Sequence, residues 1–199
     1  MTITVTIMWA FQLFLAGLPM LWVVLMGVMA IAGAVGAYHF FPHVAKRINS
    51  FLNPAEGDNY QIAKSLEAFR NGGVFGRGPG AGDVKQFLPD SHTDFIFAVA
   101  GEEFGVMVCL IILALFAFVV LRGLVRVWQE SDLYIVLAVV GILTQFGMQA
   151  VINMGVAVNL FPAKGMTLPF LSYGGSSVVA IALGMGMMLS LTRRRFGKK

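Results

Sequence analysis

Charge and cysteine are both scarce in this sequence. Only 12% of its 199 residues are charged, whereas a soluble domain averages about a quarter. The single cysteine, Cys109, lies inside an apolar stretch, which excludes a framework of internal disulfides. Hydrophobic residues make up 58% of the chain. This composition excludes an ordinary soluble domain and predicts an all-α integral membrane protein, a polytopic helical bundle.

Five apolar segments recur along the chain, and each is expected to be a helix because only helices satisfy the backbone of an open chain in lipid. Their predicted bounds are 2–16, 20–38, 94–121, 133–158 and 170–191. Each of the last four contains about 18 or more mostly apolar residues, which is enough to cross a bilayer. The first is shorter and starts almost at Met1, which favours a span whose beginning is missing.

The positions of the basic residues predict the orientation of these spans. Five of the fourteen Lys and Arg residues lie in the tail 193–199, and Arg122 and Arg126 follow the third span. Short loops rich in Lys and Arg stay in the cytoplasm. The tail and the loop 122–132 are therefore expected inside, and the long connection 39–93 is expected to be one large extracytoplasmic loop.

Two parts of that loop have recognisable patterns. NYQIAKSLEAFRNGG predicts an amphipathic helix at the outer surface, because Ile62, Leu66 and Phe69 fall on one face. GGVFGRGPGAGDVK follows, without the Gly-Lys-Ser/Thr ending of a nucleotide-binding loop. A flexible loop is the expected structure there.

Four carboxylates stand in LPDSHTDFIFAVAGEEFG, at the start of the third apolar segment. Ser91 is a predicted N-cap, which places Asp94 in the first helical turn. Glu102 and Glu103 lie deeper, where ionisable side chains usually face a cavity or a partner. Asp94 and Glu102 are expected on one side of the helix, eight residues apart, while Glu103 points elsewhere and is expected to pair with a basic residue.

Amides and hydroxyls are expected near the same end of the bundle. Gln145, Gln149 and Asn153 recur every four residues on one helix face. Gln145 is interpreted as a packing contact between helices, whereas Asn153 is a candidate for substrate binding. Ser172 and Ser176 of LSYGGSS are further candidates, with tight helix packing as the alternative.

Cations complete the predicted outer cavity. Lys164 follows the fourth apolar segment, and Arg70, Arg77 and Lys85 lie in the long loop. Carboxylates beside cations at the level of lipid headgroups suit a substrate that carries both phosphate and sugar hydroxyls.

Three long motifs in the same order resemble the SEDS family (shape, elongation, division and sporulation). They are YQIAKSLEAFRNGGVFGRGPG, LPDSHTDFIFAVAGEEFG and NMGVAVNLFPAKGMTLPFLSYGGSS. Within the third, the sequence KGMTLP resembles the division branch of the family more than the rod-elongation branch. The resemblance implies about ten spans in the whole membrane domain, of which this chain would supply the last five. The resemblance implies that residues 1–199 are the carboxyl-terminal half of such a membrane domain.

The resemblance also implies a function. The family polymerises lipid II into peptidoglycan glycan strands at the outer face of the bacterial cytoplasmic membrane. The implied partner is a class B penicillin-binding protein, and the implied location is the division septum. The family's essential aspartate falls on Asp94, its important glutamate on Glu102 or Glu103, and its lysine before the Gly-x-Thr-Leu-Pro motif on Lys164.

The implied mechanism is a single inverting displacement of undecaprenyl diphosphate. Asp94 would act as general base, while Lys164 with Arg77 or Lys85 would offset the charge of the leaving group. No cofactor is certain. A divalent cation stays open, although the sequence has no evident ligand set, and no nucleic acid is expected as a partner.

Two other functions stay open. One is a transporter that flips lipid II, and the other is a non-catalytic divisome scaffold that recruits the penicillin-binding protein. Transport predicts polar residues along the whole path. The inner halves of the third and fifth apolar segments carry none, which favours chemistry at one face.

Overall fold

The computed structural model describes residues 2–52, 60–162 and 165–193, and every secondary-structure element in these ranges is a helix. The elements are α1 (Thr2–Leu15), α2 (Met20–Phe40), α3 (Pro42–Leu52), α4 (Tyr60–Gly72), the short 3₁₀ helix η1 (Val84–Gln86), α5 (Ile96–Val127), α6 (Leu133–Ala157) and α7 (Gly175–Leu191). The expected all-α fold is confirmed, because all five apolar segments form helices. Among the described residues, α2, α5 and α6 are long and apolar enough to cross a membrane, whereas α7 is apolar but only 17 residues long.

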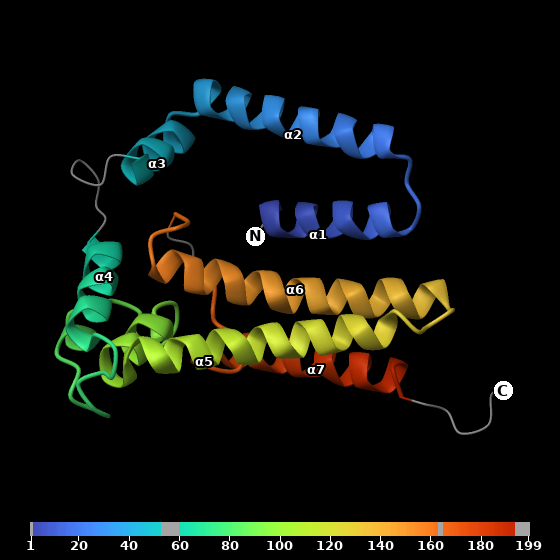
Figure 1. The fold of residues 1–199 in the computed structure, drawn as a ribbon. Coiled ribbons are helices and arrows are strands. Elements are labelled where there is room, and N and C mark those ends of the chain that lie inside the picture. Colours follow the sequence, from blue (N-terminus) through green and yellow to red (C-terminus); the bar gives the residue numbers. More distant parts are fainter. Residues whose placement is uncertain (1, 53–59, 163–164, 194–199) are drawn as a thin grey trace.

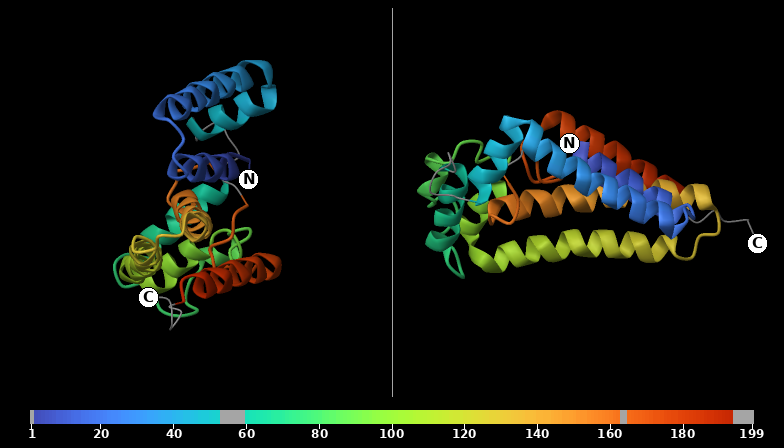
Figure 2. Two further views of the ribbon diagram at one scale, coloured as in Figure 1. Left: turned by 90° about the vertical axis from the view of Figure 1, so that its right-hand side faces the viewer. Right: turned by 90° about the horizontal axis from the view of Figure 1, so that it is seen from above.

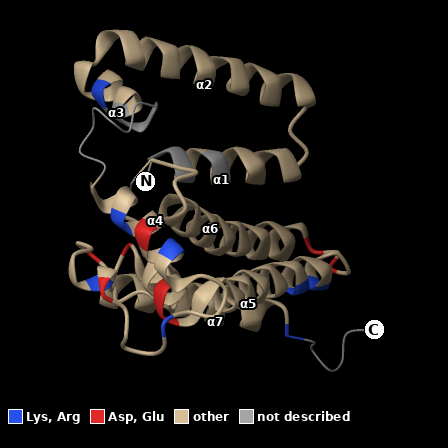
Figure 3. Cartoon of the chain, turned by 60° about the vertical axis from the view of Figure 1, so that its left-hand side comes forward, with Lys and Arg blue, Asp and Glu red and all other residues tan. Residues whose placement is uncertain are grey.

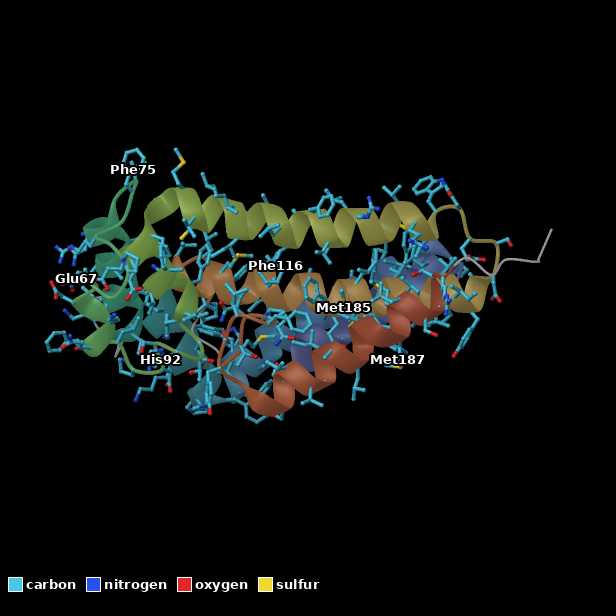
Figure 4. The ribbon with its side chains drawn as sticks, turned by 90° about the horizontal axis from the view of Figure 1, so that it is seen from below. Glu67, Phe75, His92, Phe116, Met185 and Met187 are labelled. Atoms are coloured by element: carbon cyan, nitrogen blue, oxygen red, sulfur yellow. The ribbon has the colours of Figure 1, made fainter. Side chains whose placement is uncertain are left out.

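The helices pack lengthwise into a bundle. In Figures 1 and 2, α5, α6 and α7 lie side by side, α1 runs along α6, and α2 lies outside α1. The core between α5 and α6 includes Phe116 and Phe146, whose ring centroids are 5.3 Å apart. Met185 of α7 packs against the same cluster (Figure 4).

Helix α4 closes one end of the bundle. The predicted amphipathic helix is confirmed, and its buried residues are Ile62, Ser65, Ala68 and Gly72, whereas Leu66 and Phe69 are only half-buried. The Ser65 hydroxyl donates a hydrogen bond to the Ala157 carbonyl at the end of α6, at 2.6 Å. This contact fixes α4 to the helix bundle.

Helix α3 occupies residues that were expected to be part of a loop. Its first residue is Pro42, a position that proline favours because the missing N–H has no intrahelical acceptor there. The amphipathic pattern of PHVAKRINSFL indicates this helix. The pattern was missed because it directly follows the much more apolar segment of α2.

The third apolar segment is not one continuous helix. Gly105 interrupts α5 with φ 79° and ψ 178°, a backbone conformation that is essentially restricted to glycine. The segment 73–78 of the glycine-rich run lies against this interruption. Four backbone hydrogen bonds join them: Val106 N–H to Gly73 O at 3.0 Å, Met107 N–H to Val74 O at 3.3 Å, Arg77 N–H to Glu102 O at 3.0 Å and Gly78 N–H to Glu103 O at 2.9 Å.

These bonds replace the helical hydrogen bonds lost at Gly105, so irregular backbone is satisfied by protein near the start of a membrane-crossing segment. The expectation of a flexible loop is therefore wrong for the segment 73–78. Glycine is needed on both sides of the contact, because a Cβ at Gly76 would collide with the backbone of Glu103 and Phe104, and a Cβ at Gly105 would collide with the backbone of Val74 and Gly76.

Charged residues gather at the two ends of the bundle (Figure 3). Acidic and basic side chains surround α4 and the start of α5 at one end. At the other end, Arg126 Nε donates a hydrogen bond to the Thr192 carbonyl at 3.0 Å, which joins the ends of α5 and α7. The long apolar helices run between these two polar ends.

Candidate functional site

Asp94 lies in a turn before α5. The N–H groups of Thr93, Asp94 and Phe95 all donate to the Asp90 carbonyl, at 3.0, 3.0 and 3.2 Å, and Asp90 has a positive φ of 56°. The helix begins only at Ile96, with no side-chain N-cap. The predictions that Ser91 caps the helix and that Asp94 lies in its first turn are therefore wrong.

The Asp94 carboxyl is half-buried, and no hydrogen bond or ion pair reaches it from the described part of the chain. It lies beside Gly165, where a Cβ would be 3.3 Å from Asp94 Oδ2. Burial raises the pKa of the Asp94 carboxyl above its ordinary value, and the charge of Asp90 raises it further. The carboxyl therefore combines a raised proton affinity with free acceptor capacity.

Asn153 and Ser172, both candidates for substrate binding, are 2% and 4% exposed. Asn153 Nδ2 donates to the Asp94 carbonyl at 2.8 Å and to the Met166 carbonyl at 2.6 Å. The Ser172 hydroxyl donates to the Thr93 carbonyl and accepts from Leu168 N–H. The structure thus brings both side chains to the backbone around Asp94.

Glu102 is fully buried, with 0% exposure. Its carboxylate accepts three backbone hydrogen bonds, from the N–H groups of Asp83 and Val84 at 3.0 Å and of Lys85 at 3.2 Å. Gly82 permits this approach, because a Cβ there would lie 2.8 Å from Glu102 Oε2. Glu102 therefore holds the loop at η1.

Asp94 and Glu102 do not share a helix face as expected, because Asp94 precedes α5. Glu102 faces the loop at η1, whereas the Asp94 carboxyl faces Gly165. The two carboxylates are separate features of the same end of the bundle.

The loop cations already hold carboxylates. Lys85 Nζ lies 2.5 Å from Glu103 Oε1, so the expected pairing of Glu103 with a basic residue is confirmed. Arg77 pairs with the exposed Asp83 at 2.8 Å. An exposed ion pair of this kind contributes about 0–1 kcal/mol, so it is easily exchanged.

The remaining candidates are more scattered. Ser176 is exposed at the start of α7, and Lys164 lies outside the described residues. Gln145 is also exposed, so the expected contact between helices is not made within the described chain. His92 lies at the polar end together with α4 (Figure 4).

Two residues near the site were not predicted as part of it. Gly165 borders the Asp94 carboxyl, and Thr167 accepts hydrogen bonds from Gln149 at its carbonyl, at 2.9 Å, and at its hydroxyl, at 3.2 Å. The Thr167 hydroxyl also donates to Ser177 at 2.8 Å. The recurrence of Gln149 and Asn153 on one helix face indicated that this face makes polar contacts. It could not identify the acceptors, which lie outside α6.

In the described residues, no group of three or more His, Cys, Asp or Glu side chains lies together so that it could hold a metal ion. The arrangement that stands out is one half-buried carboxyl with a raised pKa, at the polar end of an apolar bundle.

Comparison with known proteins agrees with this architecture. Residues 1–196 match the cell cycle protein family of FtsW, RodA and SpoVE. The chain is 45% identical to the probable peptidoglycan glycosyltransferase FtsW of Caulobacter vibrioides, over 98% of this chain and 50% of that protein. It is 41% identical to the stage V sporulation protein E of Bacillus subtilis, over 92% of this chain and 51% of that protein.

A solved structure is similar as well. One of its chains matches with a TM-score of 0.72 and 27% identity, over 94% of this chain and 53% of that chain; the structure is described as "Structural coordination of polymerization and crosslinking by a peptidoglycan synthase complex". The fold and the polar end together define a helical membrane protein of the SEDS class. The chain belongs to the FtsW, RodA and SpoVE family, and it spans about half the length of the curated relatives it matches.

Proposed function

We propose that this chain is part of a peptidoglycan glycosyltransferase that polymerises lipid II at the outer face of the cytoplasmic membrane during cell division. The observation that carries the proposal is the Asp94 carboxyl, half-buried and without a protein partner in the described residues. The relatives named peptidoglycan glycosyltransferase support the reaction class.

Asp94 is the general base of the proposed reaction. It takes the proton from the acceptor sugar hydroxyl as that oxygen forms a bond to the anomeric carbon of the lipid-linked donor. The bond from this carbon to the diphosphate oxygen breaks, and undecaprenyl diphosphate leaves with the bonding electrons. One displacement inverts the α-linked donor to a β-linked product.

Cations at the same end offset the charge of the leaving diphosphate. Lys85 and Arg77 hold Glu103 and Asp83, so each must exchange a carboxylate for the diphosphate. Lys164 directly precedes Gly165 in the sequence, and Gly165 borders the Asp94 carboxyl. We therefore assign the first role in charge compensation to Lys164.

The polar end with Asp94 is the outer end in this proposal. Arg122 and Arg126 lie on the last turns of α5, far from α4, and the chain continues beyond α7 into the basic tail. Basic residues of short loops favour the cytoplasm. The partner is a class B penicillin-binding protein at the septum, since the similar solved chain comes from a complex described by polymerisation and crosslinking.

The test is polymerisation of lipid II by the complete polymerase of which this chain is part, reconstituted in proteoliposomes with a class B penicillin-binding protein and penicillin to block crosslinking. Glycan strands that a muramidase digests are the expected product, because inversion creates β-links. Partner binding without strands contradicts the proposal and favours the scaffold. Movement of lipid II across the vesicle membrane without polymer favours the transporter.

The rate of polymerisation should depend on the charge of Asp90. The base works only when ionised, so activity falls as pH drops through the pKa of Asp94. Because the charge of Asp90 raises that pKa, Asp90→Asn is expected to lower it and move the acid limb to lower pH. Asparagine also tolerates the positive φ of this position.

Initial rates measured from acid to neutral pH check this prediction. Asp132→Asn is the matched control, since it makes the same change at the exposed N-cap of α6, where asparagine caps equally well. An acid limb that stays in place in Asp90→Asn would show that the rate does not report the ionisation of Asp94.

A further inference from the structure

We infer that Ser172 and Asn153 are positioning residues, which hold the turn that carries Asp94 through its carbonyl groups and do not contact the substrate. The inference rests on the proposed function for the role of Asp94. The hydrogen bonds themselves are independent of that function.

The turn is held on both sides of its backbone. Its N–H groups converge on the Asp90 carbonyl, as described above. Its three consecutive carbonyls each accept a hydrogen bond from a distant part of the chain: His92 O from Tyr173 N–H at 2.9 Å, Thr93 O from the Ser172 hydroxyl, and Asp94 O from Asn153 Nδ2 at 2.8 Å. We call these three bonds the carbonyl clamp.

Helix α5 does not use these carbonyls. Near its start, the N–H groups of Ala98 and Val99 both donate to the Phe95 carbonyl. The bonds to the Thr93 and Asp94 carbonyls are part-buried, and a carbonyl withdrawn from water without a donor is costly. The carbonyl clamp therefore supplies donors that the helix cannot provide to the turn.

The two side chains have no donor left for a substrate. The one hydroxyl hydrogen of Ser172 goes to Thr93 O, and its oxygen accepts from Leu168 N–H at 2.7 Å. Both Nδ2 hydrogens of Asn153 are used, for the carbonyls of Asp94 and Met166. Burial to 4% and 2% exposure also keeps both residues away from a substrate.

The orientation of the Asn153 amide is determined by its two acceptors. A flipped amide would place an oxygen against the carbonyls of Asp94 and Met166, whose lone pairs would repel it. Asn153 Oδ1 is buried and has no partner among the described residues. The two hydrogen bonds that Nδ2 donates therefore fix the Asn153 side chain.

Asn153 also connects the two sides of the Asp94 carboxyl. One of its hydrogen bonds holds Asp94 itself, and the other holds Met166, next to Gly165, which borders the carboxyl. A displacement of about 1 Å in a reacting group can cost about 10²-fold in rate. Loss of the carbonyl clamp should therefore lower kcat and leave substrate affinity nearly unchanged.

The test compares Ser172→Ala and Asn153→Asp with wild type in the reconstituted polymerase. Asn153→Asp is isosteric and places an oxygen against both carbonyls, so it is expected to have the larger effect. We expect kcat to fall about 10- to 100-fold, with KM for lipid II changed less than about threefold. Ser190→Ala is the matched control, because Ser190 is exposed at the opposite end of α7.

Hydrogen exchange gives a second readout that needs no activity. In Ser172→Ala, the amides of Leu168 and of residues 93–95 are expected to exchange faster than in wild type. Ser172→Cys keeps the side-chain geometry, with a sulfur larger than the hydroxyl oxygen and only a weak donor, and it is expected to lie between alanine and wild type. It serves as the variant of choice where alanine does not fold.

Two results would overturn the inference. A raised KM with unchanged kcat would mean that these side chains bind substrate directly. Unchanged exchange of residues 93–95 in Ser172→Ala would mean that the carbonyl clamp does not hold the turn, whether or not wild type polymerises lipid II. Absence of polymerisation in wild type, with accelerated exchange in the variant, would contradict the proposed function alone.

Discussion

Asp94→Asn is expected to lower the rate of lipid II polymerisation by about 10²–10⁴-fold, the usual loss when a general base is removed. The amide keeps the shape of the side chain and all backbone bonds of the turn, but it cannot take the proton from the acceptor hydroxyl. The measurement is the initial rate of strand formation in proteoliposomes at neutral pH.

The same variant is expected to be as stable as wild type or more stable. The Asp94 carboxyl is half-buried and makes no hydrogen bond or ion pair within the described chain, so its removal breaks no contact and relieves a desolvated charge. Asp132→Asn at the other end of the bundle controls for the chemical change. A rate within a few-fold of wild type in Asp94→Asn would exclude this carboxylate as the base.

Gly105→Ala is expected to destabilise the protein by at least about 3 kcal/mol. The conformation of Gly105, at φ 79° and ψ 178°, costs any other residue about 1–3 kcal/mol. A Cβ there would also collide with the backbone of Val74 and Gly76, which cannot move without losing the hydrogen bonds of the segment 73–78. The second cost adds to the first.

Thermal unfolding in detergent measures this loss, and hydrogen exchange locates it. The amides of Arg77 and Gly78, which donate to the interruption in α5, are expected to lose protection. Gly186→Ala is the matched control, because a Cβ there meets nothing within 4 Å and alanine favours the helix. A Gly105→Ala protein with the stability and protection of wild type would contradict the docking of this segment.

The pattern of apolar residues predicted the helices well, because burial in lipid leaves no other structure for long apolar runs. It predicted their ends less well. Helix α7 begins at Gly175, five residues after the predicted start, because Ser172 and its neighbours are held by the turn at Asp94. Helix ends depend on which distant groups satisfy the last backbone donors and acceptors.

For the carboxylates too, the sequence predicted some features and the tertiary structure decided others. Their depth in the apolar segment indicated that Glu102 and Glu103 are paired or enclosed, and Glu103 does pair with Lys85. The three N–H groups around Glu102 come from a loop whose position no spacing in the sequence discloses. Sequence distance along a helix assigned Asp94 and Glu102 to one face, and the actual start of α5 at Ile96 separates them.

The sequence by itself determined that this chain is a helical membrane protein with a polar end and an apolar body, since composition and hydropathy act residue by residue. It also determined which side chains are available for chemistry, of which the Asp94 carboxyl is the most important. Only the tertiary structure decided that Asp94 lies outside the helix with a carboxyl that has no partner among the described residues, that Asn153 and Ser172 hold its backbone, and that a glycine-rich segment completes the interrupted α5. The physical reason is that buried backbone groups must find partners, and these partners lie far away along the chain, 92 residues in the case of Ser65 and the Ala157 carbonyl.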